Sequence, residues 1–288
     1  MRKNENALPE SGISKKALIV FLVLVILLSG IVEAVYCSDG PDWLVGLLMW
    51  LPAISAFVAS IIALIDAKEK YNPIKHARLI GIKFCNPLYV LLGLVIPFVY
   101  LFIPYRIYWT MHPENYAYSC VALSVVLKDL CVYTVVCVII SLLTAIGEEI
   151  GWRGFMLPAL RQRIGVMGAL AVVSIFWCLW HFPLLIFGGY MEGTPLWYQL
   201  TAFVLCIFPV GIIAGVLTLK SKSVWPAAFL HAAHNAFDQM VFDVITRGDD
   251  RMFFVSETGV FTIACAWIIA VIMLILFVKI KSRKGSEE

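Results

Sequence analysis

The sequence predicts an all-α fold, a polytopic membrane helix bundle with about eight transmembrane helices. Of the 288 residues, 61% are hydrophobic and only 14% are charged, and the mean hydropathy is +0.90. Uncharged runs of about 20 residues, enough for a helix to cross a hydrocarbon core of about 30 Å, recur along the chain. The runs are continuously apolar, whereas lipid-facing barrel strands alternate, so strands are not expected. The formal charge of +3 is small and scattered, which argues against a nucleic-acid surface.

Six segments are uncharged and long enough to span a bilayer. They are 43–65, 87–105, 130–147, 166–187, 196–219 and 258–278. Two more qualify if one acid is tolerated: 17–36, with Glu33 near an interface, and 224–242, with Asp238. A helix break is expected between 118 and 163, because that stretch is too long for one crossing and carries charges.

Lysine and arginine residues outside the spans predict the orientation, because they are enriched on the cytoplasmic side of membrane proteins. Most of them fall on one side: Arg2, Lys3, Lys15, Lys16, Lys68, Lys70, Lys75, Arg78, Lys83, Arg153, Arg161, Arg163, Lys220, Lys222, Lys279, Lys281, Arg283 and Lys284. The opposite side holds only Arg106, Arg247 and Arg251. Both termini are therefore expected in the cytoplasm.

The expected organisation is a single transmembrane domain over 17–280, between cytoplasmic tails at 1–16 and 281–288. The basic start and apolar stretch could be a secretory signal, but an uncleaved first helix is expected, because further spans follow. Short loops favour a prokaryotic plasma membrane. The eight cysteines show no metal-binding spacing, and only Cys37 and Cys120 lie near the outer face, where they could pair.

Ionisable residues inside membrane spans are costly and usually face the bundle interior, so they mark candidate functional positions. The first cluster contains Glu148, Glu149 and Arg153; the last two are four residues apart and can pair on one helix face. Gly147 and Gly151 form a GxxxG pattern, which would let a neighbouring backbone come close. Taken alone, this cluster could be an interfacial pair that anchors a helix end.

Two further clusters contain histidine. Trp177 and His181 lie within an otherwise uncharged span, and His231, His234 and Asn235 lie in another, followed by Asp238. A single buried histidine that bonds to a backbone carbonyl would be unremarkable. Three such clusters on three helices are more economically explained by one shared, water-filled cavity.

These residue types suit hydrolysis of an acyl bond. A desolvated glutamate can act as a general base toward water, while a histidine positions that water. The other histidine and the asparagine can donate hydrogen bonds to the developing oxyanion. This scheme requires no cofactor. Alternatively, Glu148, His181 and His231 could bind a divalent metal such as zinc, although the chain has no HExxH motif.

The three motifs, in this order, resemble the CPBP (CAAX-protease and bacteriocin-processing) family of intramembrane proteases. The motifs are Glu148-Glu149-x-x-x-Arg153, an aromatic residue four before a histidine at Trp177 to His181, and His231-x-x-x-Asn235. The family is also called ABI, and it includes the type II CAAX prenyl endopeptidases. The resemblance covers a core at about 130–243.

The resemblance implies an eight-span helical fold that cleaves peptide bonds in a membrane cavity. By motif match, Glu148 with His181 would activate water, His231 with Asn235 would form the oxyanion hole, and Glu149 with Arg153 would support the site. The family usually has phenylalanine where this chain has Trp177, and His234 is not a motif residue; both are treated as secondary. The family has been described both as metalloproteases and as glutamate-type proteases.

Two other functions remain open. One is a non-proteolytic bacteriocin self-immunity or scaffold protein on the same fold. The other is a proton-coupled transporter that uses Glu148, His181, His231 and Asp238 as a relay, although the halves of the chain show no obvious inverted repeat. For a protease, the expected partners are the lipid bilayer and a peptide or protein substrate, prenylated or not, that enters from the membrane or the cytoplasmic side.

Overall fold

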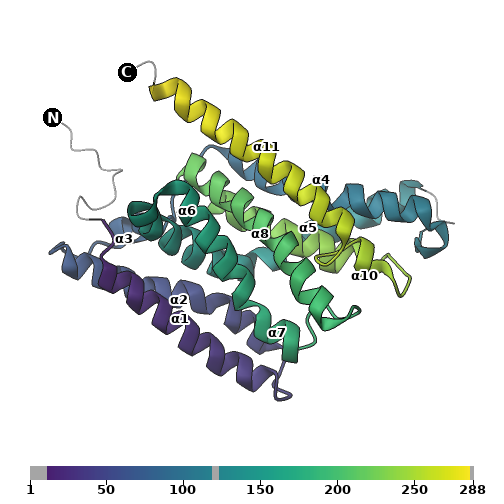
Figure 1. Cartoon of the computed structure of the whole chain (residues 1–288), viewed down its shortest axis with the longest axis horizontal. Coiled ribbons are helices and arrows are strands. Elements are labelled where there is room, and N and C mark those ends of the chain that lie inside the picture. Colours follow the sequence, from purple (N-terminus) through teal and green to yellow (C-terminus); the bar gives the residue numbers. More distant parts are fainter. Residues whose placement is uncertain (1–11, 119–122, 286–288) are drawn as a thin grey trace.

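The structure is a computed structural model that describes residues 12–118 and 123–285 (Figure 1). Its helices are α1 Lys15–Tyr36, α2 Trp43–Asp66, α3 Pro73–Leu79, α4 Pro87–Met111, η1 Pro113–Asn115, α5 Leu123–Glu149, η2 Ile150–Met156, α6 Leu157–Trp180, α7 Phe182–Phe187, α8 Leu196–Ser221, α9 Trp225–Asn235, η3 Ala236–Phe242, α10 Arg251–Phe254 and α11 Val260–Gly285. In these two ranges the only β pairing is an isolated bridge between Tyr116 and Thr246. The all-α prediction is confirmed.

Within the residues that the structure describes, six helical stretches are long and apolar enough to cross a membrane. They are Lys15–Tyr36, Trp43–Asp66, Pro87–Met111, Cys131–Phe187, Leu196–Ser221 and Val260–Lys279. Their outward side chains are apolar, for example Leu27, Ile139 and Leu276, each more than half exposed, as expected of surfaces that face lipid. The chain is therefore an integral multi-pass membrane protein.

The expected count of eight spans is not confirmed as such. The stretch 131–187 contains two of the predicted spans, and the predicted span 224–242 is divided between α9 and η3. The eleven residues of α9 extend only about 16 Å, too short to cross a bilayer alone. Glu33, expected near an interface, lies in the last turn of α1 with its side chain buried in the bundle.

The chain reverses direction within the range of α6, at a kink between its residues 157–164 and 166–180. Glu148 is hydrogen-bonded to Trp177, 29 residues further on, which a continuous helix would place about 43 Å away. Gly165 provides the reversal, with φ 73° and ψ −179°, a conformation that glycine adopts without a Cβ penalty. The break expected between 118 and 163 thus falls just beyond that segment, while the segment itself contains the π-helix η2.

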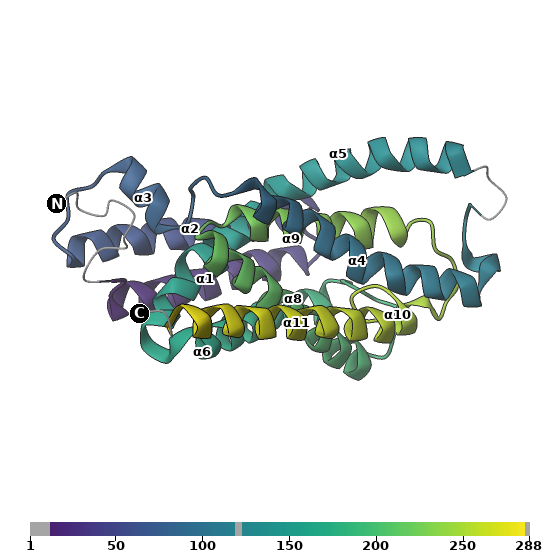
Figure 2. The ribbon, with the colours of Figure 1, turned by 90° about the horizontal axis from the view of Figure 1, so that it is seen from above.

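Close packing of α2 against α5 and η2 holds the first motif in place. A Cβ on Gly147 would lie 2.6 Å from the Met49 carbonyl oxygen, and one on Gly151 would lie 2.4 Å from Pro52 Cβ. The GxxxG pattern therefore permits the close backbone approach expected of it. Viewed from above, α5 runs along one side of the bundle beside α9 (Figure 2).

The two ends of the bundle differ. The start of α1, the end of α11 and α3 lie at one end, while α7 and α10 lie at the other (Figure 1). Arg153, expected on the cytoplasmic side, instead lies inside the bundle, where its side chain is 1% exposed. Its position therefore gives no information on the orientation of the helices. Cys37 is free, and Cys120 lies outside the described residues, so their pairing stays a prediction.

Candidate active site

Glu148 lies in the last turn of α5, where the helix changes to the π-helix η2, and its side chain is 1% exposed. Two indole N–H groups donate to its Oε2: Trp177 at 2.7 Å and Trp152 at 3.3 Å. These bonds fix the carboxylate and leave Oε1 to the cavity. A phenylalanine at position 177 could not donate such a bond, so the departure from the family motif has a direct structural role.

Glu149 and Arg153 form the ion pair expected from their spacing, with Nη1 and Oε1 2.8 Å apart and both side chains fully buried. The same Oε1 accepts a hydrogen bond from His231 Nδ1 at 3.0 Å. The Arg153 guanidinium also lies 4.3 Å from the centroid of the Trp177 ring, a cation–π contact. Glu149 thus orients His231, with the Nε2 atom of the ring directed away from the carboxylate.

His181 ends α6 as its C-cap residue and is half-buried. Its Nδ1 lies 2.8 Å from the Trp177 carbonyl oxygen, to which it must donate, because a carbonyl only accepts. In the neutral ring this leaves Nε2 unprotonated, as an acceptor of a proton or a hydrogen bond. The ring packs against Phe203 and Trp180, with centroids 5.3 and 5.0 Å away.

A second buried network adjoins these residues and was not predicted. His234 bonds through Nδ1 to the Tyr100 hydroxyl at 2.8 Å and through Nε2 to Glu257 Oε1 at 3.0 Å. Glu257 also accepts from the Tyr190 hydroxyl at 2.8 Å and from Gln239 at 3.2 Å. Because both ring nitrogens of His234 are occupied, this histidine positions its neighbours rather than offering a free atom.

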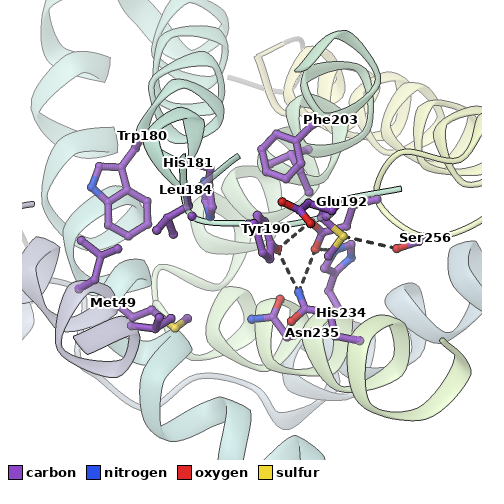
Figure 3. A pocket seen from close by; sticks show the side chains of 18 of the residues that line it. Met49, Trp180, His181, Leu184, Tyr190, Glu192, Phe203, His234, Asn235 and Ser256 are labelled. Carbon is purple, nitrogen blue, oxygen red and sulfur yellow. Dashed lines mark hydrogen bonds and ion pairs between the residues drawn. The ribbon is translucent and has the colours of Figure 1, made fainter. Parts of the chain in front are cut away.

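One cavity of about 540 Å³ connects the two networks. Its walls include Glu148, Trp177, His181, His231, His234, Asn235, Tyr190, Gln239 and Glu257. His181, Tyr190, His234 and Asn235 face the same space in Figure 3. The structure thus brings together all four residues expected to act on substrate, and it places Glu149 and Arg153 behind them, outside the cavity wall.

Asp238, the second acid of the predicted relay beside Glu148, does not line this cavity. It is fully buried and accepts hydrogen bonds from the Tyr105 hydroxyl at 3.0 Å and the Ser256 hydroxyl at 2.8 Å. These bonds tie η3 to α4 and to the loop before α11. Asp238 therefore has a structural role, because it holds these segments of the fold together.

The expected metal ligands do not form a ready binding site. Within residues 12–118 and 123–285, no group of three His, Cys, Asp or Glu side chains has an arrangement that could hold a metal ion. Glu148 already accepts two indole bonds on Oε2, and His231 is turned toward Glu149 through Nδ1. These bonds leave Glu148 Oε1 and the Nε2 atoms of His181 and His231 available, so the divalent metal stays an alternative prediction.

Comparison with known proteins supports the motif assignment. Residues 131–237 match the model of the type II CAAX prenyl endopeptidase Rce1-like family. The chain is also 36% identical over 133 residues to a protein named CAAX prenyl protease 2 from the archaeon Methanococcus maripaludis. That match covers 44% of this chain and 46% of the relative, so it spans about half of either protein. Over its motif-bearing core, the chain is therefore similar to the type II CAAX prenyl endopeptidases of the CPBP family.

Proposed function

We propose that the chain is an intramembrane endopeptidase that hydrolyses a peptide bond inside the cavity. One observation carries the proposal: Glu148, His181, His231 and Asn235, which come from three separate parts of the chain, line the same cavity. A carboxylate, two histidines and an amide around a space of about 540 Å³ can accommodate an extended peptide segment and a water molecule. The name of the archaeal relative supports a CAAX-type endopeptidase activity.

In this proposal, Glu148 and His181 activate the attacking water. Glu148 acts as general base through Oε1, and the unprotonated Nε2 of His181 accepts a hydrogen bond from the same water and aligns it. The proton taken by Glu148 then passes to the leaving amine, which completes hydrolysis and regenerates the carboxylate.

His231 and Asn235 stabilise the oxyanion of the tetrahedral intermediate. Asn235 donates through its side-chain amide, and His231 donates through Nε2. Because Nδ1 of His231 already faces Glu149, donation from Nε2 requires a doubly protonated ring, which the Glu149 carboxylate stabilises. Arg153 balances the charge of Glu149, so these two buried residues together support His231.

The test is cleavage of a quenched fluorescent peptide library, with and without prenylated CAAX peptides, by purified protein in detergent. Wild type should cleave, whereas Glu148→Gln, which keeps the shape of the side chain, should not. The same assay with a chelator addresses the metal alternative, and retained activity is expected. A well-folded wild type that cleaves no peptide would contradict the proposal and favour the immunity or scaffold function.

A further inference from the structure

A second, apolar groove lies between the first turns of α4 and of α9, two helices that pack side by side (Figure 2). The groove has a volume of about 390 Å³ and is lined by Phe84, Cys85, Pro87, Val90, Leu91, Leu94, Trp225 and Phe229. No residue that the structure describes lines both this groove and the active-site cavity. On α9, Trp225 and Phe229 line the groove, whereas His231 and His234 line the cavity, so this helix separates the two spaces.

The groove follows the start of a membrane-spanning helix. Pro87 is the first residue of α4, which is long and apolar enough to cross a membrane. At a rise of 1.5 Å per residue, Leu94 lies about 10 Å further along the helix. Phe84 is fully exposed and Leu91 is more than half exposed. The groove therefore extends from the end of a span toward its middle, where a hydrocarbon chain can cover these side chains.

Three cationic side chains lie next to the shallow end of the groove: Arg78 at the end of α3, Lys83 before α4, and Lys222 after α8. Lys83 directly precedes Phe84 of the groove wall. The connections that carry Lys83 and Lys222 are joined, because the Ser223 hydroxyl donates to the Lys83 carbonyl oxygen at 2.6 Å. The fold thus gathers basic residues from three segments at one edge of the groove.

The charges of these residues are not balanced by nearby acids. Among the residues that the structure describes, no carboxylate forms an ion pair with Arg78, Lys83 or Lys222. Asp66 and Glu69, the acids of the α2–α3 region, each pair with another lysine. Burial of Lys83, together with the positive charges of Lys222 and Arg78, lowers the pKa of its ammonium group. An anion among the three cations would relieve this repulsion.

We propose that the groove binds an anionic phospholipid, with one acyl chain along its apolar wall and the phosphate among Arg78, Lys83 and Lys222. Basic side chains beside an apolar surface at the end of a membrane span are the chemistry that recognises such a lipid. A zwitterionic lipid carries its own cation and gains less from the three positive charges. This site is separate from the proposed protease function and does not depend on it.

The prenyl chain of a substrate fits the groove less well. Such a chain carries no charge and gains nothing from the basic edge. The peptide bond to be cleaved would also have to reach Glu148, which lines the active-site cavity on the other side of α9. The observations therefore favour a phospholipid as the occupant.

The charge requirement is tested by native mass spectrometry of the full-length protein in detergent. Phosphatidylglycerol and phosphatidylcholine with the same acyl chains are the probes, and wild type should bind the first about 10-fold more tightly. The triple glutamine variant of Arg78, Lys83 and Lys222 should bind the two lipids equally. A control variant removes the same number of charges from exposed lysines that do not line the groove, and should keep the preference: Lys15→Gln, Lys68→Gln and Lys70→Gln.

The apolar wall is tested by filling it. Leu91→Trp places an indole in the groove and should weaken the binding of both lipids about 10-fold, because the acyl chain loses its space. Leu92→Trp is the matched control, since Leu92 is the next residue of the same helix and is exposed but does not line the groove. Phosphatidylglycerol should raise the melting temperature of wild type and of Leu92→Trp, but not of Leu91→Trp. The same unfolding curves establish that each variant is folded.

Several results would overturn the proposal. One is equal binding of the two lipids by wild type, and another is an unchanged preference in the triple variant. Displacement of phosphatidylglycerol by a prenylated peptide, but not by its unprenylated form, would assign the groove to substrate instead. Displacement by glycerol phosphate at the same concentration as the lipid would show an anion site without a chain site. None of these measurements requires peptide cleavage, so failure of the protease function leaves this test intact.

Discussion

Trp177→Phe tests how this chain holds its proposed general base. The indole N–H donates to Glu148 Oε2 at 2.7 Å, and the residue is only 2% exposed. Phenylalanine, the usual residue of the family motif, keeps an aromatic wall and a ring face for Arg153 but has no donor. The substitution therefore removes one bond to a buried carboxylate and little else.

The magnitude follows from the type of bond. Hydrogen bonds to charged groups contribute about 1.5–3 kcal/mol, and each 1.36 kcal/mol in the barrier is tenfold in rate. Trp152 still donates to the same oxygen, although at 3.3 Å. We expect kcat to fall by about 10- to 150-fold, with a small change in KM, because the bond orients Glu148 rather than the substrate.

The assay is peptide cleavage in detergent, together with thermal unfolding. Trp109→Phe is the control, because Trp109 is also buried and also donates through its indole, at 2.9 Å to Thr246, but does not line the cavity. It should lose comparable stability and keep its kcat. If both variants lose activity in proportion to stability, the role given to Trp177 is wrong.

Other predictions concern the support of the site and the contact between α3 and α2. Glu149→Gln should destabilise the protein by about 3–5 kcal/mol, because the buried charge of Arg153 then has no carboxylate partner. Thermal unfolding measures this effect, and an unchanged melting temperature would contradict the prediction. Glu257→Gln should lower kcat/KM by about 10-fold in the cleavage assay without loss of folding, because the anionic acceptor of His234 is lost; wild-type kinetics would count against it. Burial lowers the pKa of His76, which bonds to Ser60, below its ordinary 6.5. Since the unfolded chain then binds the proton more readily, stability should decline as the pH falls below about 6.5, and His76→Asn should weaken that dependence; identical pH profiles for the two proteins would refute it.

The parts of the fold and site that could be predicted are those set by local sequence. Apolar runs indicated the long helices, and the i, i+4 spacing of Glu149 and Arg153 indicated their ion pair, because both depend on neighbours in the chain. The convergence of the three motifs was also expected, since a buried carboxylate and two histidines are costly in lipid unless they share a polar cavity.

The rest depends on contacts between residues far apart in sequence. Glu257 precedes the last span with no motif around it, and its role appears only once α11 packs beside α4 and α8 and brings it to His234. The reversal at Gly165 requires a positive φ that hydropathy does not reveal.

The central claim is that Glu148, His181, His231 and Asn235 act together on one peptide bond. The most direct measurement compares kcat/KM and thermal unfolding for Glu148→Gln, His181→Ala, Asn235→Ala and His234→Ala against wild type. Activity should be abolished in the first two, reduced by on the order of 10² or more in Asn235→Ala, and reduced less in His234→Ala, with all four proteins folded. Losses that are equal in the four variants and follow their unfolding would contradict the assignment.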